Sequence, residues 1–137
     1  MLEFGQTQDA PETADLIRDV TEAEFMAEVV EASMTIPVIV DFWAPWCGPC
    51  KTLGPQLEQA VKAQKGRVRM AKVDVDGAQQ IAQQLRVQSI PTVYAFWQGQ
   101  PVDGFQGAVP QSEITAFVER VAAMNAEDGG LADAIAA

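Results

Sequence analysis

The feature that most constrains this chain is a buried strand that leads into two cysteines and then into a helix. Residues 37–43 are almost all apolar, which is typical of a strand covered on both faces. Cys47 and Cys50 follow in a short loop and are the only cysteines among the 137 residues. Apolar residues then recur at helical spacing over residues 53–61. A strand, a tight cysteine loop and a helix in this order predict that the two thiols act together in redox chemistry.

The composition excludes several other classes of function. The chain carries 19 acidic and 9 basic residues, a net charge of −10, which argues against binding to nucleic-acid phosphates. It has no histidine, so Ser-His-Asp and Cys-His catalysis and histidine-ligated metal sites are excluded. Two cysteines fall short of the four ligands of a structural zinc ion unless two chains share one. We therefore expect neither a metal site nor a nucleic-acid partner.

No segment has the pattern of a targeting or membrane sequence. The first residues lack the basic and apolar regions of a secretory signal. No run approaches the roughly 18 apolar residues of a membrane span. We therefore expect a cytoplasmic protein without a membrane partner.

Hydrophobic periodicity divides the chain into alternating strands and helices. Strands are predicted at residues 16–20, 38–43, 68–75, 92–97 and 102–106. Helices are predicted from a capping box of Thr21 and Glu24, from the cysteine loop to about residue 64, over 78–85 and over 110–123. Pro55 is expected to kink the second of these helices. The order βαβαβαββα predicts an α/β sandwich whose sheet mixes parallel and antiparallel strands.

The ends of the chain depart from this regular pattern. Residues 1–14 are polar, lack periodicity and are expected to form a flexible arm. We assign residues 15–123 to one folded domain and residues 124–137 to a C-terminal tail. The tail is expected to break at Gly129 and Gly130 and then to start a further helical region. Two interpretations of the tail stay open: a frayed terminus, or the approach to a longer helical protein.

The position of the cysteines before a helix indicates how they would react. At a helix N-terminus, Cys47 is expected beside free backbone N–H groups and the positive end of the helix dipole, which lower the pKa of a thiol. Positions three apart on a helical turn place two Cα atoms about 5–6 Å apart, within reach of a disulfide. Cys47 is expected to attack a substrate disulfide, and Cys50 to resolve the mixed disulfide. Pro49 suits the first helical turn, where a missing N–H costs nothing.

A carboxylate and a lysine lie in strands that are otherwise apolar. Asp41 interrupts the strand six residues before Cys47, so it is expected in or beside the core. Burial raises the pKa of a carboxyl group, which could then exchange protons near neutrality and accept the proton of Cys50. Lys72, on the neighbouring predicted strand, is a candidate to modulate it. The alternatives are a structurally paired strand-end Asp41 and a solvent-facing Lys72.

Two further positions, Pro91 and Gly107, do not indicate a functional site when considered without the cysteines. Pro91, between Ile90 and Thr92, is allowed as the first residue of an apolar strand. A cis bond is present in only about 5–6% of X-Pro pairs, so the residues alone do not predict one. Gly107 follows the last strand and, taken alone, is typical of a turn.

Taken together, these motifs resemble the thioredoxin family over about residues 16–121. The run from Val40 to Lys51 is similar to the family's active-site signature without a break. The resemblance places Asp41 on the buried aspartate, Pro55 on the helix-kinking proline and Lys72 on the lysine that faces the aspartate. It also implies that residues 90–92 form a cis-proline loop against the cysteines.

The resemblance implies a fold, an activity and a set of site residues. The fold is the thioredoxin fold, an α/β fold whose central mixed five-stranded sheet has helices on both faces. The activity is disulfide reduction by Cys47 and Cys50, with Gly48 and Pro49 modulating them and no cofactor beyond their own disulfide. Partners would be disulfide-containing proteins and a thioredoxin-reductase-type electron donor. A groove for an extended substrate segment is expected from Trp46, Ile90, Pro91, Gly107 and Ala108.

Other functions remain open at this point. A binding module could hold partner chains in the same groove and use the thiols only for regulation. A disulfide oxidant or isomerase is a third reading, although the Gly48-Pro49 pair resembles reducing members. Some bacterial proteins join an N-terminal thioredoxin module to tetratricopeptide repeats, and the tail from Leu131 resembles the approach to such a region.

Overall fold

The structure, a computed structural model, describes the backbone of residues 16–136 and the side chains of residues 16–125. The arm expected at residues 1–14 lies outside the described residues. The strands are β1 (Ile17–Asp19), β2 (Val38–Trp43), β3 (Arg69–Asp74), β4 (Thr92–Trp97) and β5 (Gln100–Gln106). The helices are η1 (Met26–Glu31), η2 (Ala32–Met34), α3 (Gly48–Ala63), η3 (Val75–Gly77), α4 (Gln79–Gln84) and α5 (Gln111–Ala136).

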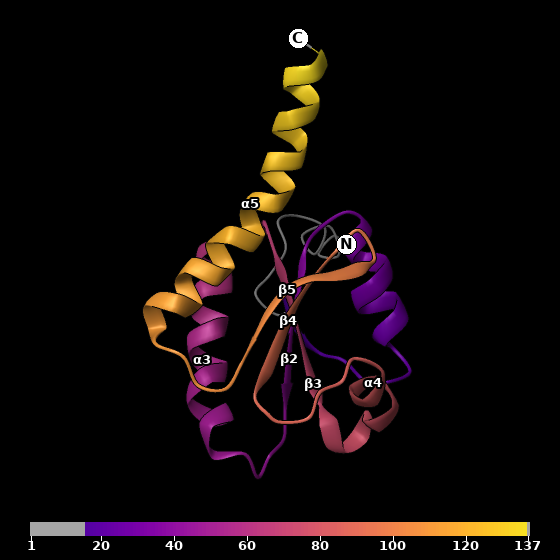
Figure 1. The fold of residues 1–137 in the computed structure, drawn as a ribbon, viewed down its shortest axis with the longest axis vertical. Helices are drawn as coiled ribbons and strands as arrows, with labels where there is room; N and C mark the ends of the chain where they lie inside the picture. Colours follow the sequence, from indigo (N-terminus) through magenta and orange to yellow (C-terminus); the bar gives the residue numbers. More distant parts are fainter. Residues whose placement is uncertain (1–15, 137) are drawn as a thin grey trace, which may run out of the picture.

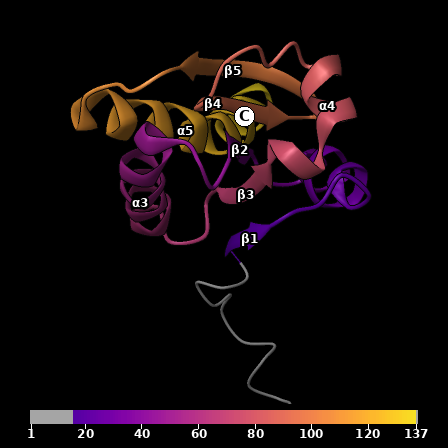
Figure 2. The same cartoon turned by 90° about the horizontal axis from the view of Figure 1, so that it is seen from below.

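All five strands form one mixed sheet in the order β1-β3-β2-β4-β5 (Figure 2). The pairs β1/β3 and β2/β3 are parallel, whereas β2/β4 and β4/β5 are antiparallel. Helices α3 and α5 cover one face of the sheet, and η1 and α4 cover the other (Figure 1). The predicted fold class, a mixed five-stranded sheet between two layers of helices, is confirmed.

Strand β2 lies at the centre of the sheet and divides the core between these two layers. Its even-numbered residues 38, 40 and 42 pack in the cluster that holds Phe25 and Val29, on the η1 side. Ile39 packs instead with residues of α3 and α5. Because side chains alternate along a strand, Asp41 and Trp43 point to the same side as Ile39, toward α3. This alternation places the one carboxylate of β2 beneath the helix that carries the cysteines.

The segment after β1 begins as predicted and ends differently. The N–H of Thr21 donates to Glu24 Oε1 at 3.0 Å, and the N–H of Glu24 donates to Thr21 Oγ1 at 3.2 Å, which confirms the capping box. The helix that follows is π-helical over η1 and tightens to 3₁₀ geometry in η2. Ser33 fastens this end to the β4–β5 turn, because its Oγ donates to Val30 O at 2.7 Å and accepts from the N–H of Gly99 at 2.9 Å.

The last helix, α5, ends later than the sequence predicts. The sequence predicts an end near residue 123 and a break at Gly129 and Gly130, but the helix runs from Gln111 to Ala136 and extends past the sheet (Figure 1). A glycine inside a helix costs only about 1 kcal/mol relative to alanine, so two glycines do not by themselves end one. Among the described side chains of α5, those buried in the core lie between Ile114 and Ala122.

Removing residues 126–137 is expected to leave the stability of the domain nearly unchanged, because the buried core side chains described for α5 all precede the cut. The melting temperature measured by calorimetry should fall by less than about 4 °C, which is roughly 1 kcal/mol for a domain of this size. Phe117→Ala in the same helix is the control and should cost about 3–5 kcal/mol. A larger fall on truncation would show that the tail is an integral part of the fold.

Candidate active site at the N-terminus of helix α3

The two cysteines lie where β2 passes into α3. Cys47 is the N-cap of the helix, and its Sγ accepts a hydrogen bond from the N–H of Cys50 at 3.3 Å. The N–H of Cys47 in turn donates to Ala44 O at 3.0 Å, which closes the turn. The two cysteines form a disulfide, with their Cα atoms 5.4 Å apart. Pro49 lies in the first turn of α3, where its missing N–H breaks no helical hydrogen bond.

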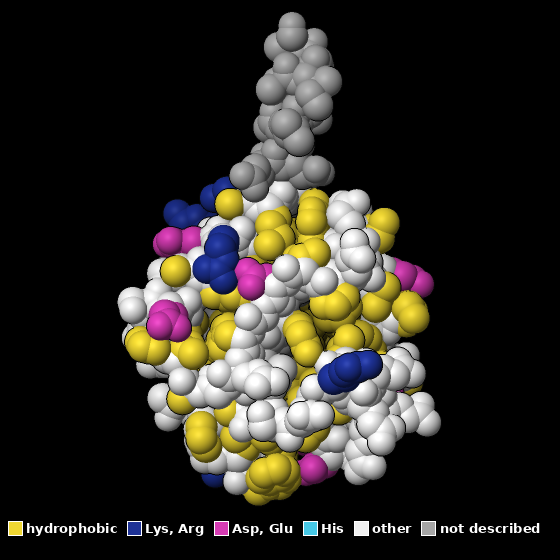
Figure 3. Space-filling model, viewed as in Figure 1, with side chains coloured by type: hydrophobic (Ala, Val, Ile, Leu, Met, Phe, Trp, Pro, Cys, Tyr) yellow, Lys and Arg dark blue, Asp and Glu magenta, His cyan; other side chains and the backbone are white. Residues whose placement is uncertain are grey.

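Apolar residues pack around the disulfide. Cys47 and Cys50 pack with Ala44, and Val75 and Ile90 lie against this cluster. The neighbouring Trp46 is 68% exposed, and its indole Nε1 donates to Asp76 Oδ2 at 3.0 Å. Apolar side chains reach the lower end of the molecule in Figure 3, where the β2–α3 loop lies in Figure 1. Charged side chains are sparse on the face that Figure 3 shows.

The loop before β4 has the geometry that the resemblance implies. The Ile90-Pro91 peptide bond is cis, and Pro91 is buried. The N–H of Gly107 donates to Pro91 O at 2.8 Å, which joins the end of β5 to the start of β4. Gly107 has φ +79°, a left-handed conformation that a residue with a side chain rarely adopts.

An apolar cavity of about 330 Å³ opens beside Trp46 and contains only part of the predicted groove. Trp46 and Ile90 line it, whereas the predicted groove residues Pro91, Gly107 and Ala108 do not. Its other lining residues, which the sequence does not single out, are Val75, Ala82, Val87, Gln88 and Ser89. In the sequence they lie inside or just outside predicted elements with no distinguishing pattern, which is too general to identify a site.

Asp41 is buried beneath the cysteines and lacks a complete set of hydrogen bonds. It is 2% exposed, and among the described residues its Oδ1 has no hydrogen-bond partner. Burial raises the pKa of the Asp41 carboxyl from 3.8 to about 7; the Lys72 ammonium offsets part of this rise and the Glu58 carboxylate adds to it. A cavity of about 160 Å³ is lined by both Asp41 and Cys50.

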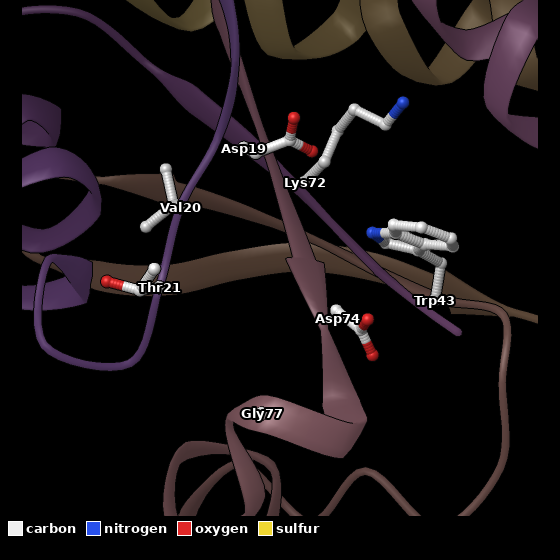
Figure 4. A pocket seen from close by; sticks show the side chains of 7 residues that line it. All are labelled: Asp19, Val20, Thr21, Trp43, Lys72, Asp74 and Gly77. Carbon is white, nitrogen blue, oxygen red and sulfur yellow. The ribbon is translucent and has the colours of Figure 1, made fainter. Parts of the chain in front are cut away.

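Lys72 is the parallel-strand neighbour of Asp41, but its ammonium pairs elsewhere. Its Nζ lies 3.0 Å from Glu58 Oε2 on α3 and 5.7 Å from the centre of the Trp43 ring. Figure 4 shows Lys72 and Trp43, which come from neighbouring strands, among the residues that line a third and wider cavity. Burial lowers the pKa of Lys72, but the hydrogen bond and charge of Glu58, followed by the charges of Asp19 and Asp41, raise it overall. Lys72 therefore acts on Asp41 through its charge and not as its ion-pair partner.

The described part of the chain offers no site for a metal and no membrane span. Between residues 16 and 125, no three His, Cys, Asp or Glu side chains lie close enough together to hold an ion. No described helix is long and apolar enough to cross a membrane.

Comparisons with known proteins agree with this geometry. The model of the family described as thioredoxin matches residues 16–120. The chain belongs to the thioredoxin family. Thioredoxin 1 of Nostoc sp. is 40% identical over 101 residues, which cover 74% of this chain and 92% of that protein. The thioredoxin structure from Malassezia sympodialis has a TM-score of 0.69 at 33% identity and covers 77% of this chain and 90% of that one.

A third relative joins two activities in one chain. The bifunctional thioredoxin reductase/thioredoxin of Mycobacterium leprae is 46% identical over 90 residues, which are 66% of this chain and 19% of that protein. With the disulfide at the start of α3, membership of the thioredoxin family makes this chain a dithiol–disulfide oxidoreductase that reduces protein disulfides. The binding-module and oxidant readings are not favoured by these relatives.

The raised pKa of Asp41 predicts how Asp41→Asn changes stability with pH. Because the pKa is about 7 in the folded chain and 3.8 ordinarily, the folded state favours the protonated carboxyl. The contribution of the protonated carboxyl to the stability of the fold is complete below about pH 4. It is lost as the pH rises to about 7, where burying the carboxylate costs on the order of a few kcal/mol. The free energy of unfolding of the variant, measured with denaturant, should therefore match that of the wild type near pH 4 and exceed it near pH 8. An equal difference at both pH values would contradict a buried, titrating Asp41.

Proposed function

We propose that the chain reduces protein disulfides with Cys47 as the nucleophile, Cys50 as the resolving thiol and Asp41 as the proton acceptor. The Cys47 thiolate attacks one sulfur of the substrate disulfide, forms a mixed disulfide and releases the other substrate sulfur as a thiolate. Asp41 takes the proton of Cys50, whose thiolate attacks Cys47 Sγ and expels the second substrate sulfur. The substrate leaves with both thiols, and the protein is left with the Cys47–Cys50 disulfide.

The arrangement around Cys47 is the observation that carries this proposal. Its N-cap position and the hydrogen bond from the N–H of Cys50 favour a negative sulfur on Cys47, because both place positive charge beside it. Cys50 instead lines the cavity that leads to Asp41. The two thiols thus have different surroundings, as a nucleophile and a resolving thiol require. Gly48 and Pro49 modulate them by fixing the first turn of α3.

The substrate would bind as an extended segment across the loop that follows α4. Ile90, Pro91, Gly107 and Ala108 would supply backbone and apolar contacts next to the disulfide. The cavity of about 330 Å³ beside Trp46 would receive an apolar side chain of the same segment. Support comes from Ile90, which contacts both the disulfide cluster and this cavity.

Electrons would reach the disulfide from a separate thioredoxin-reductase-type protein. The fused reductase and thioredoxin of Mycobacterium leprae supports such a pairing. The chain's own disulfide would carry the electrons, so no further cofactor enters the proposal. We place the protein in the cytoplasm, although relatives include chloroplastic and mitochondrial thioredoxins. We assign residues 15–123 to the catalytic domain, with residues 1–14 and 124–137 as additions to it.

Cysteine variants test the assigned order of attack. Cys50→Ser should still attack a protein disulfide and accumulate a mixed disulfide, because nothing resolves it. Cys47→Ser should neither turn over nor form the adduct. Mass spectrometry of each variant after incubation with an oxidised substrate protein measures this directly. If Cys47→Ser traps the substrate and Cys50→Ser does not, the roles are reversed.

Shortening Ile90 tests the groove. Ile90→Ala should raise KM for a disulfide-containing protein more than it lowers kcat, because it removes a contact made by the bound substrate. Met34→Ala, at an apolar side chain that is 52% exposed and outside this site, is the matched control and should leave both constants unchanged. Equal effects of the two variants would remove Ile90 from the groove.

A further inference from the structure

The cavity beneath Cys50 holds more charge than the proton transfer itself requires. Four charged side chains line it: Asp41, Lys51, Glu58 and Lys72. Its volume of about 160 Å³ is small, so these charged groups lie close to one another. Asp41 has a role in the proposed reaction, whereas Glu58 has none.

Glu58 is placed by helix α3 in line with the reacting group. Cys50, Gly54 and Glu58 follow one another at intervals of four, so they form one stripe along the helix. Gly54 adjoins the buried carboxyl, because a Cβ at this position would lie 3.9 Å from Asp41 Oδ2, an ordinary van der Waals distance. Glu58 therefore faces the same cavity as Cys50, one helical turn beyond the glycine.

Glu58 determines where the ammonium of Lys72 lies. The 3.0 Å ion pair and the Trp43 ring hold Nζ at the α3 end of the cavity, while Asp41 Oδ1 has no hydrogen-bond partner among the described residues. Lys72 has a flexible four-carbon stem and comes from the position opposite Asp41 in the parallel ladder. If Glu58 lost its charge, Asp41 would be the remaining carboxylate inside this cavity for Lys72 to approach.

We propose that Glu58 is a positioning residue for the proton transfer: it holds the Lys72 ammonium away from Asp41 and so keeps that carboxyl able to exchange a proton with Cys50 near neutrality. An ammonium in contact with Asp41 would stabilise the carboxylate and make it a poor proton acceptor. The proposal rests on the proposed role of Asp41. The charged groups around the ion pair are Lys51 on α3 and Asp19 on β1, besides Asp41 itself.

The titration of Asp41 in the oxidised protein tests this directly. In that state the cysteines do not titrate, so the ¹³C shift of the Asp41 carboxyl follows one group. Glu58→Gln should lower the midpoint by about one pH unit, because an ammonium that approaches a carboxylate lowers its pKa by about that much or more. Reductase activity requires an ionised Asp41, so the rise of kcat/KM with pH should move to lower pH by the same amount.

Repeating the Glu58→Gln titration in a Lys72→Met variant separates the positioning of Lys72 by Glu58 from direct repulsion between Glu58 and Asp41. If Glu58 acts through Lys72, the shift caused by Glu58→Gln should fall to less than half when Lys72 is already Met. Glu58→Asp keeps the charge, so the Asp41 midpoint of this variant should shift by less than half as much as that of Glu58→Gln. An undiminished shift in the Lys72→Met background would overturn the proposal in favour of direct repulsion.

A matched control addresses changes in overall charge. Glu28→Gln removes the same charge from another ion pair, in which Glu28 Oε1 lies 3.0 Å from Arg18, and should leave the Asp41 midpoint unchanged. No shift in Glu58→Gln would also overturn the proposal. If the Asp41 midpoint moves but the activity profile does not, the proposed role of Asp41 as proton acceptor fails while the placement of Lys72 by Glu58 stands.

Discussion

The pleat of strand β2 is the constraint on which both the fold and the site depend. Successive side chains point to opposite faces of the sheet, so the same six residues supply both cores and direct Asp41 toward α3. Side chains packed on both faces of the sheet keep β2 covered, which explains its nearly continuous apolar sequence. The strand ends directly before the cysteine loop, so its register also sets the height of the disulfide above Asp41.

Helix α3 completes the site from the opposite side of the same cavity. Cys47 caps its N-terminus, its first turn carries Cys50, and Gly54 and Glu58 continue along the same stripe as Cys50. Residues Leu57 and Val61 on an adjoining stripe pack into the core and fix the rotation of the helix. The chemistry of the thiols and the packing of the domain are therefore supported by one rigid element.

Much of this arrangement follows from local patterns, and the remainder depends on contacts distant in sequence. The strands, the capping box and the burial of Asp41 were predictable because each rests on periodicity or on one polar residue in an apolar run. The partner of Lys72 was not, because Glu58 resembles any exposed helical glutamate until the helix is docked on the sheet. The same holds for Val75 and Val87, which face Trp46 only after α4 folds back beside the cysteine loop.

The end of α5 shows the limit of reasoning from single residues. Gly129 and Gly130 lower helix propensity, but a helix already anchored by its packed first turns can continue through them. Helix propensity describes the backbone conformation that a single residue favours, whereas the length of a helix also depends on the packing of the turns before that residue.

The stripe of α3 also determines where the chain can change in length. One residue inserted between Cys50 and Glu58 would turn the rest of the helix by about 100°, and one inserted in β2 would move Asp41 to the opposite face of the sheet. Substitutions in this segment alter single contacts, but an insertion would separate the carboxyl from the thiol. The exposed turn around Lys65 and Gly66 lies beyond both elements and carries no such restriction. Between Val38 and Glu58, the spacing of the residues is therefore as much a part of the active site as their identity.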